Sequence, residues 1–240
     1  MIKTVPETGS TNADLAAAIR AGEAVGEGQW LVADRQTSGR GRQGRTWFDG
    51  HGNFMGSTVV RPHDRDPAPA SLALLTALAL YETVVPIISN PADLSLKWPN
   101  DLMLGGAKLA GILLEREGDA IIVGIGVNLA AAPELPDRKT MSLSQLGPPP
   151  DRDTFARSLS ASFDTELERW RNFGVEPIVR RWESVAHPKG TALTVHPPGE
   201  EPITAIFAGL TDDGALRLRL ASGETRVIHA GDVMLENEEG

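Results

Sequence analysis

The sequence predicts an α+β fold in which one large domain is followed by a small all-β module. Apolar helical patterns are interspersed with strand patterns that do not alternate with them regularly, which argues against a doubly wound sheet. After position 187 the pattern changes to short strands separated by Asp-Asp-Gly and Ser-Gly turns. A chain of 240 residues can bury one good core and leave room for a second module. We therefore predict two domains, at 1–187 and 188–240.

Four helices are predicted in the large domain. The triplet Ser-Thr-Asn at 10–12 precedes a short apolar pattern over 12–21, and its side-chain oxygens are expected to cap that helix. The apolar run 68–85 is shorter than the roughly 20 residues that span a bilayer, which predicts a buried helix and no membrane anchor. The segment 155–173 is amphipathic, and another short helix reaches about residue 185.

Apolar and β-branched runs predict the strands. In the large domain they are expected at 29–33, 53–60, 94–98, 108–114 and 120–129, with one more short strand before the Gly-Gly turn at 105–106. In the small module they are expected at 191–195, 203–208, 216–220 and 225–228. The polar run 34–45 is predicted to be a loop, 133–150 a turn-rich connection, and the final ENEEG a solvated tail.

Composition and charge exclude several classes of function. The chain has no cysteine, so disulfides, thiolate nucleophiles and cysteine-ligated metals are ruled out. Its five histidines show no metal-ligand spacing, and no protein side chain is assigned to a metal. A net charge of -9 repels polyanions, which argues against nucleic acid as a partner. The first residues lack the pattern of a signal peptide, so a cytoplasmic protein is expected.

The segment 39–45, Gly-Arg-Gly-Arg-Gln-Gly-Arg, is the strongest chemical signal in the chain. Glycines let backbone amides approach an anion, arginines match phosphate oxygens, and Trp47 offers a face for a purine. A flexible basic loop or a nucleic-acid tether is the alternative. The segment also fits the G-x-G-x-x-G dinucleotide pattern, but the glycines that follow cannot continue the helix which that motif requires.

Three further segments are individually weaker. Lys97-Trp98-Pro99-Asn100-Asp101 ends a strand at an exposed turn, and it could be a plain β-turn. Lys108 opens an apolar strand with Gly111 near its centre; such a lysine usually reaches to solvent, but it could also point into a cleft. A buried strand with two glycines, at 124 and 126, ends at Asn128, which by itself indicates packing as readily as a binding site.

Taken together and in this order, these segments resemble the biotin protein ligase family, whose members carry GRGR-x-GR, KWPND, K-x-AG-I and G-I/V-N. The resemblance covers nearly the whole chain. It implies a catalytic domain related to class II aminoacyl-tRNA synthetases and lipoate ligases, followed by an SH3-like β-barrel. Some members carry an N-terminal DNA-binding domain; only nine residues precede Ser10, so a short form without that domain is expected.

The resemblance also implies the site residues. The catalytic residues would be Lys108, Arg40 and Arg42. The biotin-binding residues would be Ser10, Thr11, Asn12, Gln36, Gly39, Arg40, Gly41, Arg42, Lys108 and Gly111. The ATP-binding residues would be Arg40, Arg42, Arg45, Trp47, Asn100, Asp101, Lys108 and Asn128.

The implied reaction uses ATP, biotin and Mg²⁺ to form biotinyl-5′-AMP, then transfers biotin to a lysine of a biotin carboxyl carrier protein. The family resemblance favours a homodimer. One alternative is a lipoate or octanoate ligase or transferase, which shares the fold but lacks the GRGR-x-GR loop. Another, from a different class, is a non-catalytic nucleotide- or RNA-binding module that uses the arginines.

Overall fold

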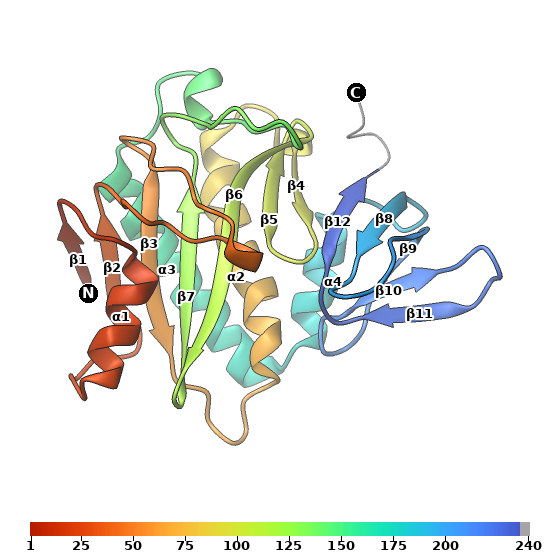
Figure 1. Cartoon of the computed structure of the whole chain (residues 1–240), viewed down its shortest axis with the longest axis horizontal. Coiled ribbons are helices and arrows are strands. Elements are labelled where there is room, and N and C mark those ends of the chain that lie inside the picture. The colour runs from red at the N-terminus through yellow and green to blue at the C-terminus, as the bar shows by residue number, and fades with distance from the viewer. Residues whose placement is uncertain (236–240) are drawn as a thin grey trace.

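The computed structural model describes residues 1–235, which form two β-sheets and four α-helices (Figure 1). The larger sheet has seven strands in the order β1-β2-β3-β7-β6-β5-β4. β1 is parallel to β2 and all other neighbouring pairs are antiparallel, so the sheet is mixed. The strands are Ile2–Val5 (β1), Trp30–Ala33 (β2), Phe54–Val60 (β3), Leu94–Lys97 (β4), Asp101–Leu104 (β5), Ala107–Glu117 (β6) and Ala120–Val127 (β7).

Helices cover both faces of this sheet (Figure 1). They are Thr11–Arg20 (α1), Leu72–Val84 (α2), Arg152–Phe173 (α3) and Glu176–Ser184 (α4). Side chains alternate along a strand, so Leu31 packs beneath α1 with Leu15, while its neighbours Trp30 and Val32 belong to the main core on the other face. α2 lies on that other face, and α3 and α4 pack against it. The face that carries α1 is covered over only part of its area.

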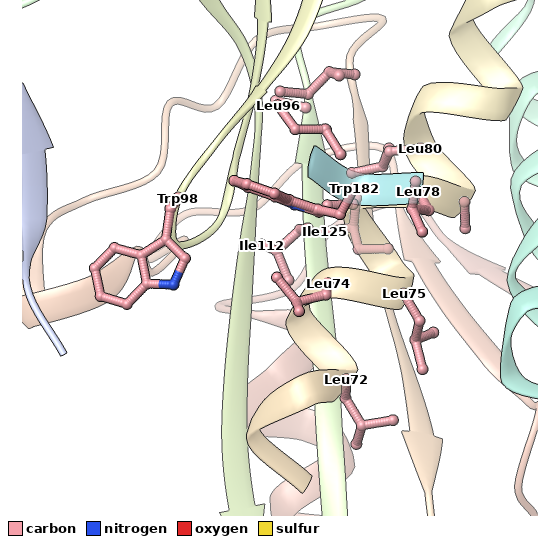
Figure 2. Packing of buried hydrophobic residues seen from close by; sticks show 14 of the residues in the cluster. Leu72, Leu74, Leu75, Leu78, Leu80, Leu96, Trp98, Ile112, Ile125 and Trp182 are labelled. Carbon is pink, nitrogen blue, oxygen red and sulfur yellow. The ribbon is translucent and has the colours of Figure 1, made fainter. Parts of the chain in front are cut away.

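α2 is the central helix of the main core. Its leucines pack against the sheet residues Ile112 and Ile125 and against Trp182 of α4 (Figure 2). The segment Pro69–Ile87 is long and apolar enough to span a bilayer, but 61 % of its most apolar window is buried within the fold. This placement agrees with the predicted buried helix, because a helix that is apolar on all sides needs covering on all sides.

The C-terminal module is a five-stranded antiparallel sheet in the order β11-β10-β9-β8-β12. Its strands are Ala192–His196 (β8), Ile203–Leu210 (β9), Leu216–Arg219 (β10), Thr225–Ile228 (β11) and Asp232–Leu235 (β12). The module lies beside the β4 and β5 edge of the large sheet (Figure 1). Residues of both parts belong to one continuous apolar cluster.

Trp98 and His187 lie at the junction between the large sheet and the C-terminal module. Trp98, which is 3 % exposed, donates a hydrogen bond from Nε1 to the carbonyl of Gly214, at 3.1 Å. His187 packs against Phe207 with ring centroids 4.4 Å apart. Neither nitrogen of the His187 ring has a hydrogen-bond partner within residues 1–235. Burial, together with the charge of Lys97, lowers the pKa of His187 to about 4.

The predicted helices and strands are confirmed, with shifts of a few residues at their ends. β1 and β12 were not predicted; each buries at most one side chain. The predicted capping of α1 is wrong: Ser10 is the N-cap residue but its side chain makes no capping hydrogen bond. The oxygens of Thr11 and Asn12 bond to side chains outside the helix instead. The predicted ENEEG tail lies outside the described residues.

Candidate active site

A cavity of about 810 Å³ opens on the partly covered face of the large sheet. Strands β3, β5, β6 and β7, the start of α1, the arginine loop 39–45 and β12 all contribute to its walls. Of the predicted site residues, those that line it are Ser10, Thr11, Asn12, Gln36, Arg40, Gly41, Arg42, Arg45, Trp47, Asn100, Asp101, Lys108, Gly111 and Asn128. Gly39 lies just behind, where an added Cβ would be 3.1 Å from the Trp47 carbonyl oxygen.

A buried polar cluster forms one end of the cavity, at the start of α1. The backbone N–H of Thr11 donates to Oε1 of Gln36 at 2.7 Å, and the hydroxyl of Thr11 is 2.6 Å from that of Ser57 on β3. Ser57 donates to Oδ1 of Asn12 at 2.6 Å. These contacts fix the orientation of four polar side chains that are all less than 9 % exposed, which pre-organises them for a polar ligand group.

The cluster extends to Glu115 on β6. Asn12 donates from Nδ2 to Oε2 of Glu115 at 2.7 Å, and Nη1 of Arg40 lies 3.9 Å from Oε1 of the same carboxylate. Sequence reasoning missed both Ser57 and Glu115. Each lies inside a strand beside another polar residue, Thr58 or Arg116, so no local pattern singled it out.

Glycines on adjacent strands form a flat floor beside this cluster. Gly111 on β6 pairs with Gly126 on β7. A Cβ added to Gly126 would lie 2.1 Å from Cε2 of Trp47, and one added to Gly124 would lie 2.3 Å from Oδ1 of Asn12. The missing Cβ atoms therefore let the Trp47 indole and the Asn12 amide rest directly on the sheet. Nε1 of Trp47 is buried and has no hydrogen-bond partner within residues 1–235.

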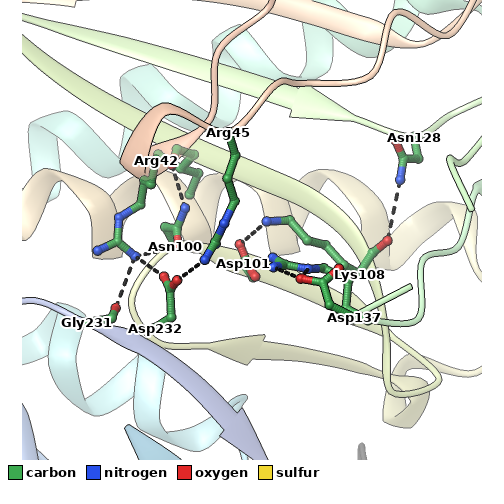
Figure 3. A network of polar contacts seen from close by, with 11 residues as sticks. Arg42, Arg45, Asn100, Asp101, Lys108, Asn128, Asp137, Gly231 and Asp232 are labelled. Atoms are coloured by element: carbon green, nitrogen blue, oxygen red, sulfur yellow. Dashed lines mark hydrogen bonds and ion pairs between the residues drawn. The ribbon is translucent and has the colours of Figure 1, made fainter. Parts of the chain in front are cut away.

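Lys108 points into the cavity and does not extend to solvent. Its Nζ donates to Oδ1 of Asp101 at 2.6 Å (Figure 3). The same nitrogen lies 5.8 Å from the centroid of the Trp47 ring. The side chains of Lys108 and Asp101 are 17 % and 12 % exposed. A bulge between Leu102 and Met103 shifts the pairing of β5 with β6. An ammonium so placed can neutralise an anionic substrate group inside the cavity.

Two asparagines flank this lysine. Asn100 donates from Nδ2 to the carbonyl of Ile112 at 2.8 Å, while its Oδ1 accepts from Arg42 at 3.3 Å. Asn128 donates to the carbonyls of Met141, at 3.2 Å, and of Lys108, at 3.4 Å. Oδ1 of Asn128 is buried and lacks a hydrogen-bond partner within the described residues. It is thus a buried acceptor that these residues leave unsatisfied.

The arginine loop crosses the open side of the cavity and contacts the C-terminal module. Gln43 adopts a left-handed conformation, with φ 55°, inside a short turn at 42–44. Arg42 and Arg45 both pair with Asp232 of β12 (Figure 3). Burial lowers the pKa of the Arg42 guanidinium, although the nearby carboxylates of Asp232 and Asp101 oppose that shift.

The cavity is strongly cationic in a chain whose net charge is -9. Within residues 1–235, seven arginine and lysine side chains line it against three carboxylates. Sequence reasoning missed four of the charged residues in the cavity wall. Asp137, Arg138 and Lys139 lie in the segment predicted only as a turn-rich connection, and no role was predicted for Asp232. The hydrogen bonds that Arg138 donates to the Asp137 carboxylate raise the pKa of Arg138. A basic pair in a polar loop was a weak signal for the first group, and nothing near Asp232 indicated its position.

Two family models match the sequence. One, described as the biotin/lipoate A/B protein ligase family, matches residues 11–129. The other, described as the biotin protein ligase C terminal domain, matches residues 194–235. Together they cover the polar cluster, the arginine loop, Lys108 and Asp232.

Full-length relatives are also similar. The biotin--[acetyl-CoA-carboxylase] ligase of Mycobacterium tuberculosis is 36% identical over 237 residues, which covers 97% of this chain and 88% of the relative. The enzyme of the same name from Paracoccus denitrificans is 37% identical, covering 94% of this chain and 97% of the relative.

Solved structures agree with these matches. The biotin protein ligase of Aquifex aeolicus in complex with biotin and ATP superposes with a TM-score of 0.86 at 28% identity, covering 98% of this chain and 99% of the other. The biotin protein ligase of Leishmania major in complex with biotinyl-5-AMP gives a TM-score of 0.66 at 27% identity, covering 95% and 98%.

Proposed function

This chain belongs to the biotin protein ligase family, and we propose that it activates biotin with ATP and transfers the biotinyl group to a lysine of a biotin carboxyl carrier protein. The observation that carries this proposal is the composition of the cavity. A buried polar cluster, a flat glycine floor and a cationic wall lie within one space of about 810 Å³. Those are the features that a small bicyclic acid and a nucleotide need in order to react side by side.

The polar cluster suits the ureido head of biotin, which carries both donors and an acceptor. We assign Thr11, Asn12 and Gln36 to that head group, because their polar atoms are already oriented and little ordering remains to be done on binding. The neighbouring Ser10, which also lines the cavity, is assigned with them. Gly111 is assigned to biotin because a side chain there would crowd Trp47 and Lys108, which border the space for the ligand. Gly39 and Gly41 give the arginine loop its close approach to the ligand.

Adenylation brings two anions together. The carboxylate oxygen of biotin attacks the α-phosphorus of ATP, the bond to the bridging oxygen breaks, and pyrophosphate leaves with its electron pair. Arg40, Arg42 and Lys108 are the catalytic candidates, because their charges would stabilise the negative charge that develops on the phosphoryl oxygens. Lys108 lies deepest among the three, beside the glycine floor, where screening by water is weakest.

ATP would occupy the remainder of the cavity. Arg45 would contact phosphate oxygens, while Asn100, Asp101 and Asn128 would surround the nucleoside with Trp47. Mg²⁺ would enter with the nucleotide, and phosphate oxygens would supply most of its ligands. Within residues 1–235 no group of three acidic or histidine side chains is placed to hold a metal ion. The cavity carboxylates Asp101, Asp137 and Asp232 are each paired with a cation.

Transfer needs no nucleophile from this chain. The free amine of the carrier lysine attacks the acyl carbon of biotinyl-5′-AMP, and AMP leaves with the electrons of the anhydride bond. The mixed anhydride hydrolyses in water, so the arginine loop must keep solvent out until the acceptor arrives. The proposal also includes a homodimer, a cytoplasmic location, and a division of the chain into a catalytic domain at 1–187 and a second domain at 188–240.

The test is ATP–pyrophosphate exchange by the purified protein with magnesium and no acid, biotin, lipoate or octanoate. Exchange that depends on biotin alone supports the proposal. Exchange with lipoate or octanoate would instead indicate a lipoate or octanoate ligase. No exchange with any acid would favour a nucleotide-binding module instead.

A further inference from the structure

The C-terminal module reaches the arginine loop through one carboxylate. Nη1 of Arg42 lies 3.5 Å from Oδ1 of Asp232 and donates to the carbonyl of Gly231 at 3.3 Å. Arg45 donates from Nη2 to the other oxygen of Asp232. The two guanidinium groups therefore share a single carboxylate, as Figure 3 shows. Asp232 lies 187 positions beyond Arg45 in the sequence, so only the folded chain brings them together.

Asp232 is itself held in place by the sheet of its module. It is the first residue of β12 and pairs with His196 of β8 in antiparallel register. A Cβ added to the preceding Gly231 would lie 3.0 Å from Cγ1 of Val195, so the backbone there is closely packed. The carboxylate thus projects from a fixed element, whereas the arginines come from a glycine-rich loop. We therefore infer that Asp232 orders the arginine loop, and that the loop does not order Asp232.

We propose that Asp232 is a positioning residue for nucleotide binding: it holds Arg42 and Arg45 at the cavity wall, both before ATP binds and in the complex, so that their other N–H groups can meet phosphate oxygens of ATP. The proposal rests on the proposed function for the identity of the incoming anion. It gives the C-terminal module a role in the first half-reaction, because the module then supplies the group that orders the loop. Asp232 itself touches no reacting atom.

A guanidinium carries several N–H donors, so each arginine can bind the Asp232 carboxylate and phosphate oxygens at the same time. A phosphate group carries more negative charge and adds further acceptors. The side chains of Arg42 and Asp232 are 23 % and 24 % exposed, and that of Arg45 is 44 % exposed. Ion pairs with this much solvent access are weak, so removing the Asp232 carboxylate should loosen the arginine loop without unfolding the chain.

The first test uses trypsin, which cleaves after arginine. In Asp232→Asn, without added ligand, cleavage after Arg42 and Arg45 should be about fivefold faster than in the parent protein. The variant loses the weak ion pairs that hold the loop, so the loop opens to the protease more often. ATP with magnesium should largely remove the difference. Glu200→Gln is the matched control, because it removes a carboxylate paired with Arg226 in the same module, away from the cavity. Equal cleavage of Asp232→Asn and the parent protein would overturn the proposal.

The second test separates positioning from a general structural role. In biotin-dependent pyrophosphate exchange, Asp232→Asn should raise the KM for ATP about five- to tenfold with kcat little changed, because part of the binding energy is then used to order the loop. The KM for biotin should not move, and Asp232→Glu should restore most of the loss. An equal rise in both KM values would contradict the proposal. If the parent protein shows no exchange, the proposed function fails, while the trypsin result still decides the role of Asp232.

Discussion

The indole of Trp47 rests on the backbone of Gly126, so closely that a Cβ on that glycine would lie 2.1 Å from Cε2 of the ring. We therefore expect Gly126→Ala to push Trp47 off the floor of the cavity. Overpacking of this kind costs about 1–3 kcal/mol, so biotin-dependent pyrophosphate exchange should fall about tenfold or more. Gly9→Ala is the control, since nothing lies within 4 Å of a Cβ added there. Full activity of Gly126→Ala would show that Trp47 can move without consequence.

Lys108 should be essential for the adenylation step. Its ammonium is held by Asp101 at 2.6 Å inside the cavity. Removing one group that stabilises transition-state charge costs about 100- to 1000-fold in rate, and Lys108→Ala should lose that much pyrophosphate exchange. Lys3→Ala, on the exposed side of β1, should keep the parent rate. A near-normal rate in Lys108→Ala would remove this lysine from the mechanism.

Ser57 should matter for biotin and not for ATP. Ser57→Ala leaves the Thr11 hydroxyl and the Asn12 carbonyl without their shared partner. An unsatisfied buried polar group costs about 1–3 kcal/mol, so calorimetry should show biotin affinity weakened by about tenfold or more. Thr58→Val removes the next hydroxyl on the strand, which donates to the Gln29 carbonyl instead. Equal biotin affinities in the two variants would argue against a role for the cluster.

His187 should make stability depend on pH. Its folded pKa is about 4, below the ordinary histidine value of 6.5, so protonation favours the unfolded chain. The contribution is complete above the unfolded pKa and is lost as the pH falls toward the folded pKa.

Between pH 7 and pH 5 this one group should cost about 2 kcal/mol of unfolding free energy. Urea titrations of His187→Leu should show a smaller decrease over that interval, whereas the exposed His51→Gln should behave like the parent protein. Identical pH profiles for all three proteins would mean that the buried ring does not titrate in this way.

Local patterns were sufficient for most of the elements. The apolar run that became α2 and the amphipathic spacing of α3 identify their helices. A helix buried on all sides must be apolar throughout, and a helix buried on one side must have an apolar face, whichever element it packs against. β1 and β12 were missed, and each buries at most one of its four side chains, so burial imposes little pattern on either segment. The side chains of Thr11 and Asn12 do not cap α1 because their oxygens bond to the tertiary partners Gln36 and Ser57 instead.

The sequence by itself determined which residue types could bind a phosphorylated ligand. Glycine and arginine at 39–45, an asparagine turn and a lysine at the head of a glycine-bearing strand carry that chemistry in their own functional groups. The tertiary structure decided what those groups face. Only the sheet places Gly126 under Trp47 and Asp101 beside Lys108. Only the packing of the C-terminal module brings Asp232 to Arg45, because contacts across such a separation depend on the whole fold and leave no local pattern.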